Sequence, residues 1–114
     1  MYQVSLQAVM DLFAQINDEV FDGTLPEPEF EIDTDPESAT WGYCLEDSGV
    51  MVLGMLYKFP NYEHFEAVLC HEMIHLWQWI LYQSGGHGET FEEIIPHFEA
   101  NGYEVSFDGS HEYV

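Results

Sequence analysis

The chain has 114 residues, of which 46% are hydrophobic and 16% aromatic, and its formal net charge at pH 7 is −21. This length and apolar content predict one compact domain over residues 1–114, and they exclude two independent domains and a disordered chain. Its 22 acidic residues stand against a single basic one, Lys58, so the surface repels nucleic-acid phosphates and anionic lipid headgroups. We therefore expect no direct nucleic-acid binding and no membrane binding, whereas basic proteins should be attracted.

The amino terminus and the cysteine content bear on the compartment. Residues 1–5 lack the basic start and apolar run of a secretion signal, and no stretch approaches the roughly eighteen apolar residues of a membrane span. The two cysteines, Cys44 and Cys70, are too few for a disulfide framework or a cysteine-rich metal ribbon, and Cys70 falls in an apolar segment expected in the core. A reducing, cytoplasmic setting is therefore expected.

The first predicted element is a helix that Ser5 caps and that ends near Asp22 and Gly23. Its apolar residues recur at helical spacing and are expected to face the core rather than a partner: Leu6, Val9, Met10, Phe13, Ile16, Val20 and Phe21.

Acidic residues alternate with apolar ones in the next segment, residues 29–33, which predicts a strand with one wet face. Nine of the 22 acidic residues fall between Asp18 and Glu37. Such a run is more typical of a solvated face than of a docking site.

Two further strands are predicted before the second helix. Residues 40–45 form the first of them, with a kink at Gly42, and residues 47–49 form a turn. Residues 50–57 are apolar on both sides, which is typical of a strand that lies against a helix.

The strongest chemical signal lies in a helix that Asn61 is predicted to cap and that ends near Tyr82. His71 and His75 are one turn apart on one face of this helix, so both imidazoles can reach one metal ion. Glu72 lies at the edge of that face, where a carboxylate can act on a metal-bound water as general base. The alternative is a pair of ordinary buried histidines bonded to backbone or carboxylate.

A third metal ligand is needed, because catalytic zinc keeps three protein ligands and one open position. His87 is the best candidate, since the preceding glycines at 85 and 86 make a reversal of the chain sterically cheap. Its rivals lie further along the chain: Glu89, Glu92, Glu93 and His97. The extended metzincin pattern is excluded, because Gln78 and Leu81 stand where that pattern has Gly and His.

A last helix is predicted to begin at Gly88 or Thr90 and to end at residues 101–102. Pro96 within it predicts a kink or a shorter helix. Val105 and Phe107 then predict a short strand or an extended tail.

Three segments, residues 21–26 (Phe-Asp-Gly-Thr-Leu-Pro), 69–75 (Leu-Cys-His-Glu-Met-Ile-His) and 86–91 (Gly-His-Gly-Glu-Thr-Phe), resemble the landmarks of the SprT-like zinc metallopeptidases. The resemblance covers about residues 5 to 108. It implies a small α+β zincin-like domain with an N-terminal helix, a short three-stranded sheet, a zinc-binding HExxH helix and a C-terminal helix. Unlike many members, this chain has neither a basic character nor a C-terminal cysteine-rich zinc ribbon.

The same resemblance implies the site. His71, His75 and His87 would bind Zn²⁺, and Glu72 would activate water. The strand at residues 50–57 would edge the cleft, where a substrate peptide could add by backbone pairing. The side chain that stabilises the oxyanion is left open among four candidates: Tyr43, Tyr57, Tyr103 and His97.

We therefore expect a zinc metallopeptidase that hydrolyses peptide bonds of protein substrates of basic character. The alternative from another class is a non-enzymatic acidic interaction protein, or DNA mimic, built on a zincin scaffold. A purely structural zinc is disfavoured, because structural sites usually have four protein ligands and commonly use cysteine.

Overall fold

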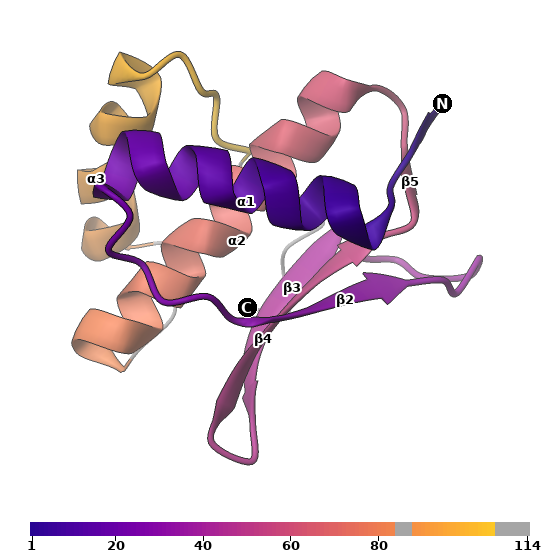
Figure 1. The fold of residues 1–114 in the computed structure, drawn as a ribbon, viewed down its shortest axis with the longest axis horizontal. Helices are drawn as coiled ribbons and strands as arrows, with labels where there is room; N and C mark the ends of the chain where they lie inside the picture. Colours follow the sequence, from indigo (N-terminus) through magenta and orange to yellow (C-terminus); the bar gives the residue numbers. More distant parts are fainter. Residues whose placement is uncertain (84–87, 107–114) are drawn as a thin grey trace.

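The computed structural model describes residues 1–83 and 88–106. Within this part the fold is α+β, with three helices, one three-stranded sheet and one two-stranded sheet (Figure 1). This architecture confirms the predicted class. The elements in chain order are β1 (Tyr2–Gln3), α1 (Leu6–Phe21), β2 (Glu29–Asp33), β3 (Gly42–Asp47), β4 (Val50–Leu56), β5 (Lys58–Phe59), α2 (Tyr62–Tyr82) and α3 (Glu89–Ala100).

The three-stranded sheet has the order β2-β4-β3, with β2 parallel and β3 antiparallel to β4. A tight turn joins β3 to β4, with Asp47 opposite Val50. Both central residues, Ser48 and Gly49, have positive φ, which matches the right-handed twist of a hairpin. The predicted turn is therefore confirmed.

The strand expected to edge the cleft is β4, and this expectation is wrong, because β4 is hydrogen-bonded on both sides. β2 reaches β4 by a parallel pairing across a long connection, which no local pattern in the sequence reveals. Among the described strands of this sheet, β2 and β3 are the outer ones. The strand predicted from residue 40 begins two residues later, at Gly42, where the Thr40 hydroxyl donates to the Gly42 carbonyl at 2.8 Å.

Helix α1 begins and ends as predicted. The Ser5 hydroxyl accepts the Ala8 N–H at 3.1 Å, and Asp22 adopts the left-handed conformation at the carboxyl end. The buried face is formed by Val9, Leu12, Phe13, Ile16 and Phe21, and α1 packs against β2 and α2. Leu6, predicted in the apolar stripe, is instead exposed.

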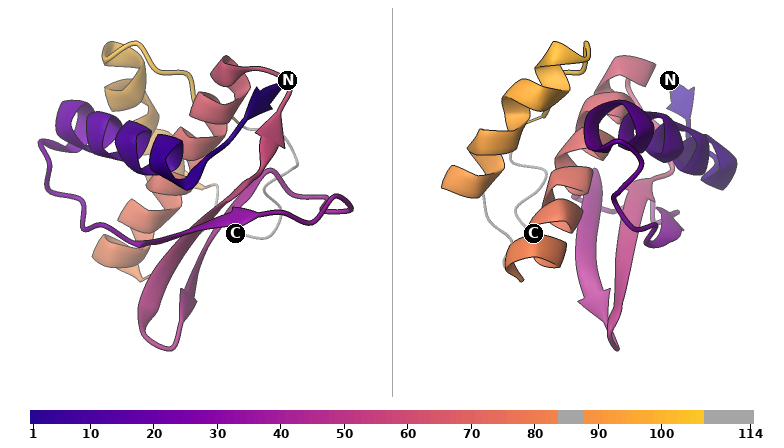
Figure 2. Two further views of the ribbon diagram at one scale, coloured as in Figure 1. Left: turned by 45° about the vertical axis from the view of Figure 1, so that its right-hand side comes forward. Right: turned by 60° about the vertical axis from the view of Figure 1, so that its left-hand side comes forward.

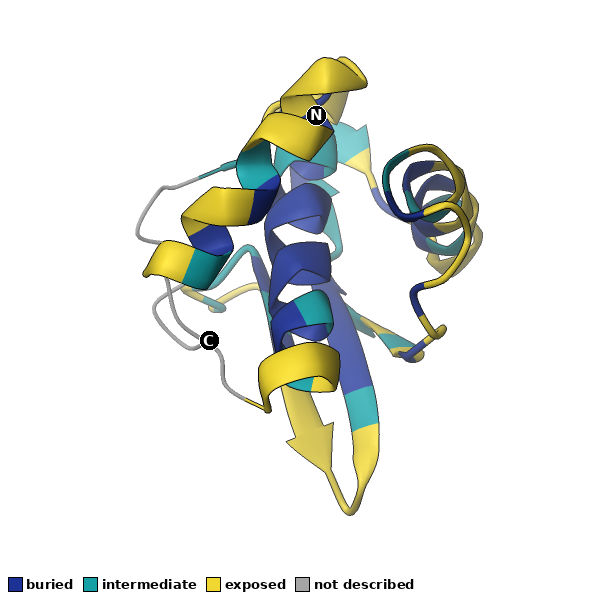
Figure 3. Ribbon diagram, turned by 90° about the vertical axis from the view of Figure 1, so that its left-hand side faces the viewer, coloured by how far each residue is buried: buried dark blue, intermediate teal, exposed yellow. Residues whose placement is uncertain are grey.

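Helix α2 is the central element of the molecule. The Asn61 side chain accepts the His64 N–H at 2.8 Å, which confirms the predicted cap. One side of α2 packs against β3 and β4, and α3 lies on the other side, away from the sheet (Figure 2). The helix is buried over most of its length and exposed at its carboxyl end (Figure 3). Cys70 lies in the core, as expected.

Helix α3 runs through Pro96, so the expectation of a shorter helix is wrong. Proline removes one internal hydrogen bond, and the buried Phe91, Ile94 and Phe98 hold the helix in place by packing. Residues 103–106 form no strand; they lie along α2 as a tail, with the Ser106 N–H donating to the Ala67 carbonyl at 3.2 Å. Phe107 lies outside the described residues. Among the described helices, none combines the length and apolar character of a membrane span.

Candidate metal centre

His71 and His75 lie side by side on one face of α2, as their spacing predicts. Their Nε2 atoms are 3.1 Å apart, and both side chains are buried. Two imidazoles on one tetrahedral zinc ion, each at about 2.0–2.1 Å, have nitrogens roughly 3.3 Å apart. The pair therefore has the spacing of two ligands of a single metal ion.

The second nitrogen of each ring is engaged by a carbonyl oxygen. His71 Nδ1 lies 2.6 Å from the carbonyl of Ser106, and His75 Nδ1 lies 2.9 Å from Oε1 of Gln78. Because these oxygens only accept, both Nδ1 atoms carry the proton, and in neutral imidazoles both Nε2 atoms then carry lone pairs. Two lone pairs that face each other at 3.1 Å repel unless a cation lies between them, so the donor set fits a metal.

Gln78 contacts a candidate metal ligand, and sequence reasoning missed it. Its side chain is 1% exposed, its oxygen accepts from His75, and its Nε2 donates to the hydroxyl of Thr90 on α3 at 2.8 Å. Gln78 thus fixes the ring of His75 and joins α2 to α3. The available signal was a polar side chain three residues after a candidate ligand, on the same helix face.

One aromatic side chain of α3, Phe91, packs against both histidines. The ring of Phe91, which is fully buried, has its centroid 4.8 Å from that of His71 and 5.3 Å from that of His75. Such packing restricts both imidazoles to one orientation and lowers the local dielectric.

The rivals for the third ligand do not join the pair. Glu89, Glu92, Glu93 and His97 are exposed on α3, and residues 1–83 and 88–106 contain no group of three His, Cys, Asp or Glu side chains that could hold a metal. His87 lies outside the described residues. Its role as third ligand stays a prediction.

Glu72 points from α2 toward β3. A Cβ atom at Gly42 would lie only 3.2 Å from Glu72 Cγ and 3.1 Å from the Gly54 carbonyl oxygen, so glycine is what allows β3 to approach the helix here. Cys44, two residues along β3, is buried nearby; burial and the Glu72 carboxylate raise the pKa of its thiol, which keeps it protonated and disfavours it as a ligand. Glu72 is therefore buried beneath an outer strand of the sheet.

Two of the four candidates for oxyanion stabilisation, Tyr43 and Tyr103, are hydrogen-bonded to carboxylates on other elements. The Tyr43 hydroxyl donates to Glu31 across the sheet, and the Tyr103 hydroxyl donates to Glu19 on α1 at 2.8 Å. His97 is exposed on α3, and the Tyr57 ring lies beside the Lys58 ammonium group. The contacts of the two bonded phenols thus lie away from the histidine pair.

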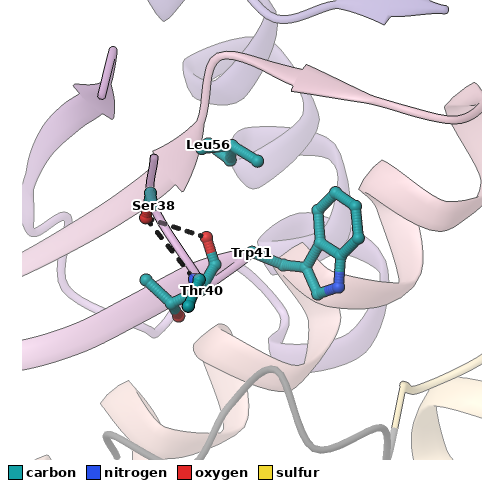
Figure 4. Close-up of a pocket in the computed structure, with 5 residues that line it drawn as sticks. Ser38, Thr40, Trp41 and Leu56 are labelled. Atoms are coloured by element: carbon teal, nitrogen blue, oxygen red, sulfur yellow. Dashed lines mark hydrogen bonds between the residues drawn. The ribbon is translucent and has the colours of Figure 1, made fainter. Parts of the chain in front are cut away.

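A small pocket of about 120 Å³ lies before the start of β3, lined by Ser38, Ala39, Thr40, Trp41 and Leu56 (Figure 4). The Ser38 hydroxyl donates to the Thr40 carbonyl at 3.4 Å. Its lining carries no carboxylate, imidazole or thiol, so the pocket offers space for a small apolar group and no acid–base or metal chemistry.

Comparison with known proteins agrees with the resemblance seen in the sequence. The model of the SprT-like family matches residues 9–111, a span that holds most of α1, the three-stranded sheet, α2 and α3. No curated protein and no solved structure matches the chain. With nearly its whole length matched, the chain belongs to the SprT-like family.

Proposed function

We propose that this chain is a zinc metallopeptidase in which His71, His75 and His87 hold Zn²⁺ and Glu72 is the general base. The observation that carries the proposal is the pair of Nε2 atoms 3.1 Å apart, with each Nδ1 bonded to a carbonyl oxygen. Family membership supports a metallopeptidase scaffold.

When bound, zinc lowers the pKa of a coordinated water to about 7 and polarises a peptide carbonyl. Glu72 accepts the proton of the attacking water and passes it to the leaving amine. Its burial between α2 and β3 strengthens electrostatic interactions at the carboxylate, because bulk water is excluded. Ser106 and Gln78 keep His71 and His75 as neutral Nδ1–H tautomers, the form in which Nε2 can bind a metal.

The substrate would bind along β3. This strand pairs with β4 on one side and packs on α2 beside Glu72. A peptide that paired with the opposite edge of β3 would have its backbone fixed by hydrogen bonds and a carbonyl near Glu72. The net charge of −21 favours basic protein substrates, whose encounter it speeds at low salt.

The test is turnover of an unfolded basic protein by the zinc-loaded chain, wild type against Glu72→Gln. The variant is nearly isosteric and removes a buried charge, so we expect equal zinc content, a melting temperature no lower than that of the wild type, and loss of turnover by about 10²-fold or more. Peptidase activity retained in Glu72→Gln would overturn the proposal.

The acidic surface favours a second candidate, a non-enzymatic protein that covers basic, DNA-binding surfaces. Its supporting observation is the solvent-facing run of β2, where Glu29 is exposed and Glu31 and Asp33 lie on the same face. Tight, salt-sensitive binding of a basic DNA-binding protein, without cleavage and unchanged in Glu72→Gln, would favour this candidate over the peptidase.

A further inference from the structure

A hollow of about 350 Å³ lies between the last turns of α2 and the β3–β4 hairpin. Its lining comes from both elements: Glu46, Met51, Trp79, Ile80 and Gln83. The carboxyl end of α2 and the tip of the hairpin are exposed on this side of the molecule (Figure 3). Because Glu46, Ile80 and Gln83 of its lining are exposed, the hollow is open to a ligand from solvent.

The hollow and Glu72 lie on the same face of α2, and β3 runs from Glu72 toward the hollow. Trp79 follows Glu72 by seven residues, which is two helical turns on one face and about 10 Å along the axis. On β3, Glu46 follows Gly42 by four residues, about 13 Å, and alternate residues of a strand face the same side. Because Gly42 lies against Glu72, the two paths lead from the candidate catalytic carboxylate to the same hollow.

The lining combines apolar and anionic groups. Trp79, Met51 and Ile80 offer surface for a hydrocarbon stem, and Glu46 offers a carboxylate. A lysine or arginine side chain has this combination, with an apolar stem that packs on such surface and a cation that pairs with a carboxylate or an indole face. The chain holds no arginine and one lysine, Lys58, whose ammonium lies 5.3 Å from the Tyr57 ring centroid. A matching lysine or arginine side chain is therefore expected from another molecule.

We propose that this hollow is a substrate subsite for a lysine or arginine side chain, about three residues from the scissile bond. Glu72 and Trp79 are about 10 Å apart along α2, and an extended peptide rises roughly 3.3 Å per residue, so the two are separated by about three substrate residues. The proposal rests on the proposed peptidase function and adds its side-chain selectivity. Glutamate or aspartate at the same substrate position is disfavoured by repulsion from Glu46.

The test is a peptide series cut by the zinc-loaded wild-type chain, with lysine, norleucine or glutamate placed in turn at each of four positions on either side of the scissile bond. Norleucine keeps the stem of lysine and lacks the charge. We expect lysine to be preferred over norleucine by about tenfold in kcat/KM at one position, mainly through KM, and the preference to shrink as salt rises.

Three variants in the hollow and one control variant locate the preference. Glu46→Gln should reduce the lysine preference to about twofold or less, and Glu46→Lys should reverse it in favour of glutamate. Trp79→Leu should weaken turnover of the lysine and norleucine peptides together. Glu37→Gln, which removes the same charge from an exposed position outside the hollow, should leave the preference unchanged.

Cleavage that continues with an unaltered lysine preference in Glu46→Gln would overturn the subsite and leave the peptidase standing. A complete lack of cleavage by the zinc-loaded wild-type chain would overturn both the subsite and the proposed peptidase function. Glu46 is exposed, so its variants should fold, and equal melting temperatures would verify this.

Discussion

The Nδ1 atom of His75 lies 2.9 Å from Oε1 of Gln78, and this bond is buried within α2. The same amide donates to Thr90, so the orientation of a candidate zinc ligand depends on the packing of α3. Groups that bond the outer nitrogen of a ligating histidine fix its tautomer and raise its basicity. If His75 binds zinc as proposed, Gln78 is a positioning residue, which acts on the metal site through His75.

Replacing Gln78 by Met should weaken zinc binding by roughly 10- to 100-fold, because methionine keeps the volume and lacks the acceptor. Gln78→Glu should retain the affinity, since a carboxylate accepts the same proton. The measurement is competition with a chelator of known affinity, together with NMR assignment of the His75 tautomer in the metal-free protein. Gln7→Met on the exposed side of α1, where the side chain bonds the exposed Asp11, is the control. Equal zinc affinity in Gln78→Met and wild type would contradict this role.

His87→Ala should lower zinc affinity by several orders of magnitude, because it would leave two protein ligands where catalytic zinc needs three. His97→Ala is the matched control, since His97 is exposed on α3 and joins no metal-holding group within the described residues. Isothermal titration with zinc measures both. A loss of zinc affinity in His97→Ala, and not in His87→Ala, would contradict the proposed set of ligands.

Gly54→Ala should destabilise the fold by about 1–3 kcal/mol, because the added Cβ would lie 2.1 Å from the Tyr43 ring. The ring lies across Gly54 so that its hydroxyl can reach Glu31. In a Tyr43→Ser background the same substitution should cost much less. Urea unfolding of the four proteins gives the coupling free energy, and a coupling near zero would show that the ring does not occupy this space.

Glu66→Gln should stabilise the fold at pH 7 and have little effect below pH 4. Burial, followed by the carboxylates of Glu63 and Glu19, raises the pKa of Glu66 above 4.5 in the folded state. The folded chain then binds the proton more tightly than the unfolded chain, so stability falls as pH rises through this range and the loss persists at neutral pH. Glutamine cannot ionise, so the Glu66→Gln variant does not lose stability as the pH rises through this range.

Thermal melting at several pH values measures the effect. Glu37→Gln, with the same change in net charge at an exposed turn, is the control. A melting temperature lowered at pH 7 by Glu66→Gln would show that the ionised carboxylate stabilises the fold instead.

Local signals in the sequence predicted what depends on neighbours along the chain. The caps at Ser5 and Asn61, the turn at residues 47–49 and the shared face of His71 and His75 all follow from contacts within four residues, and all are found in the structure. The chemistry of the histidine pair was visible for the same reason.

Features that depend on residues far apart in the chain were either not predicted or predicted wrongly. The central position of β4 comes from a parallel pairing with β2, the fit of Gly42 over Glu72 joins residues 30 apart, and the Gln78–Thr90 bond joins two helices. Periodicity and turn chemistry carry no information on such pairings. The third ligand, His87, remains a prediction from spacing and resemblance.

X-ray absorption at the zinc edge of the metal-loaded protein tests the central claim most directly, because it counts and identifies the atoms around the ion. We expect one zinc per chain with three imidazole nitrogens at about 2.0 Å and one further oxygen, and no sulfur. A sulfur neighbour near 2.3 Å, four imidazole nitrogens, or no bound zinc would contradict a three-histidine site with an open position.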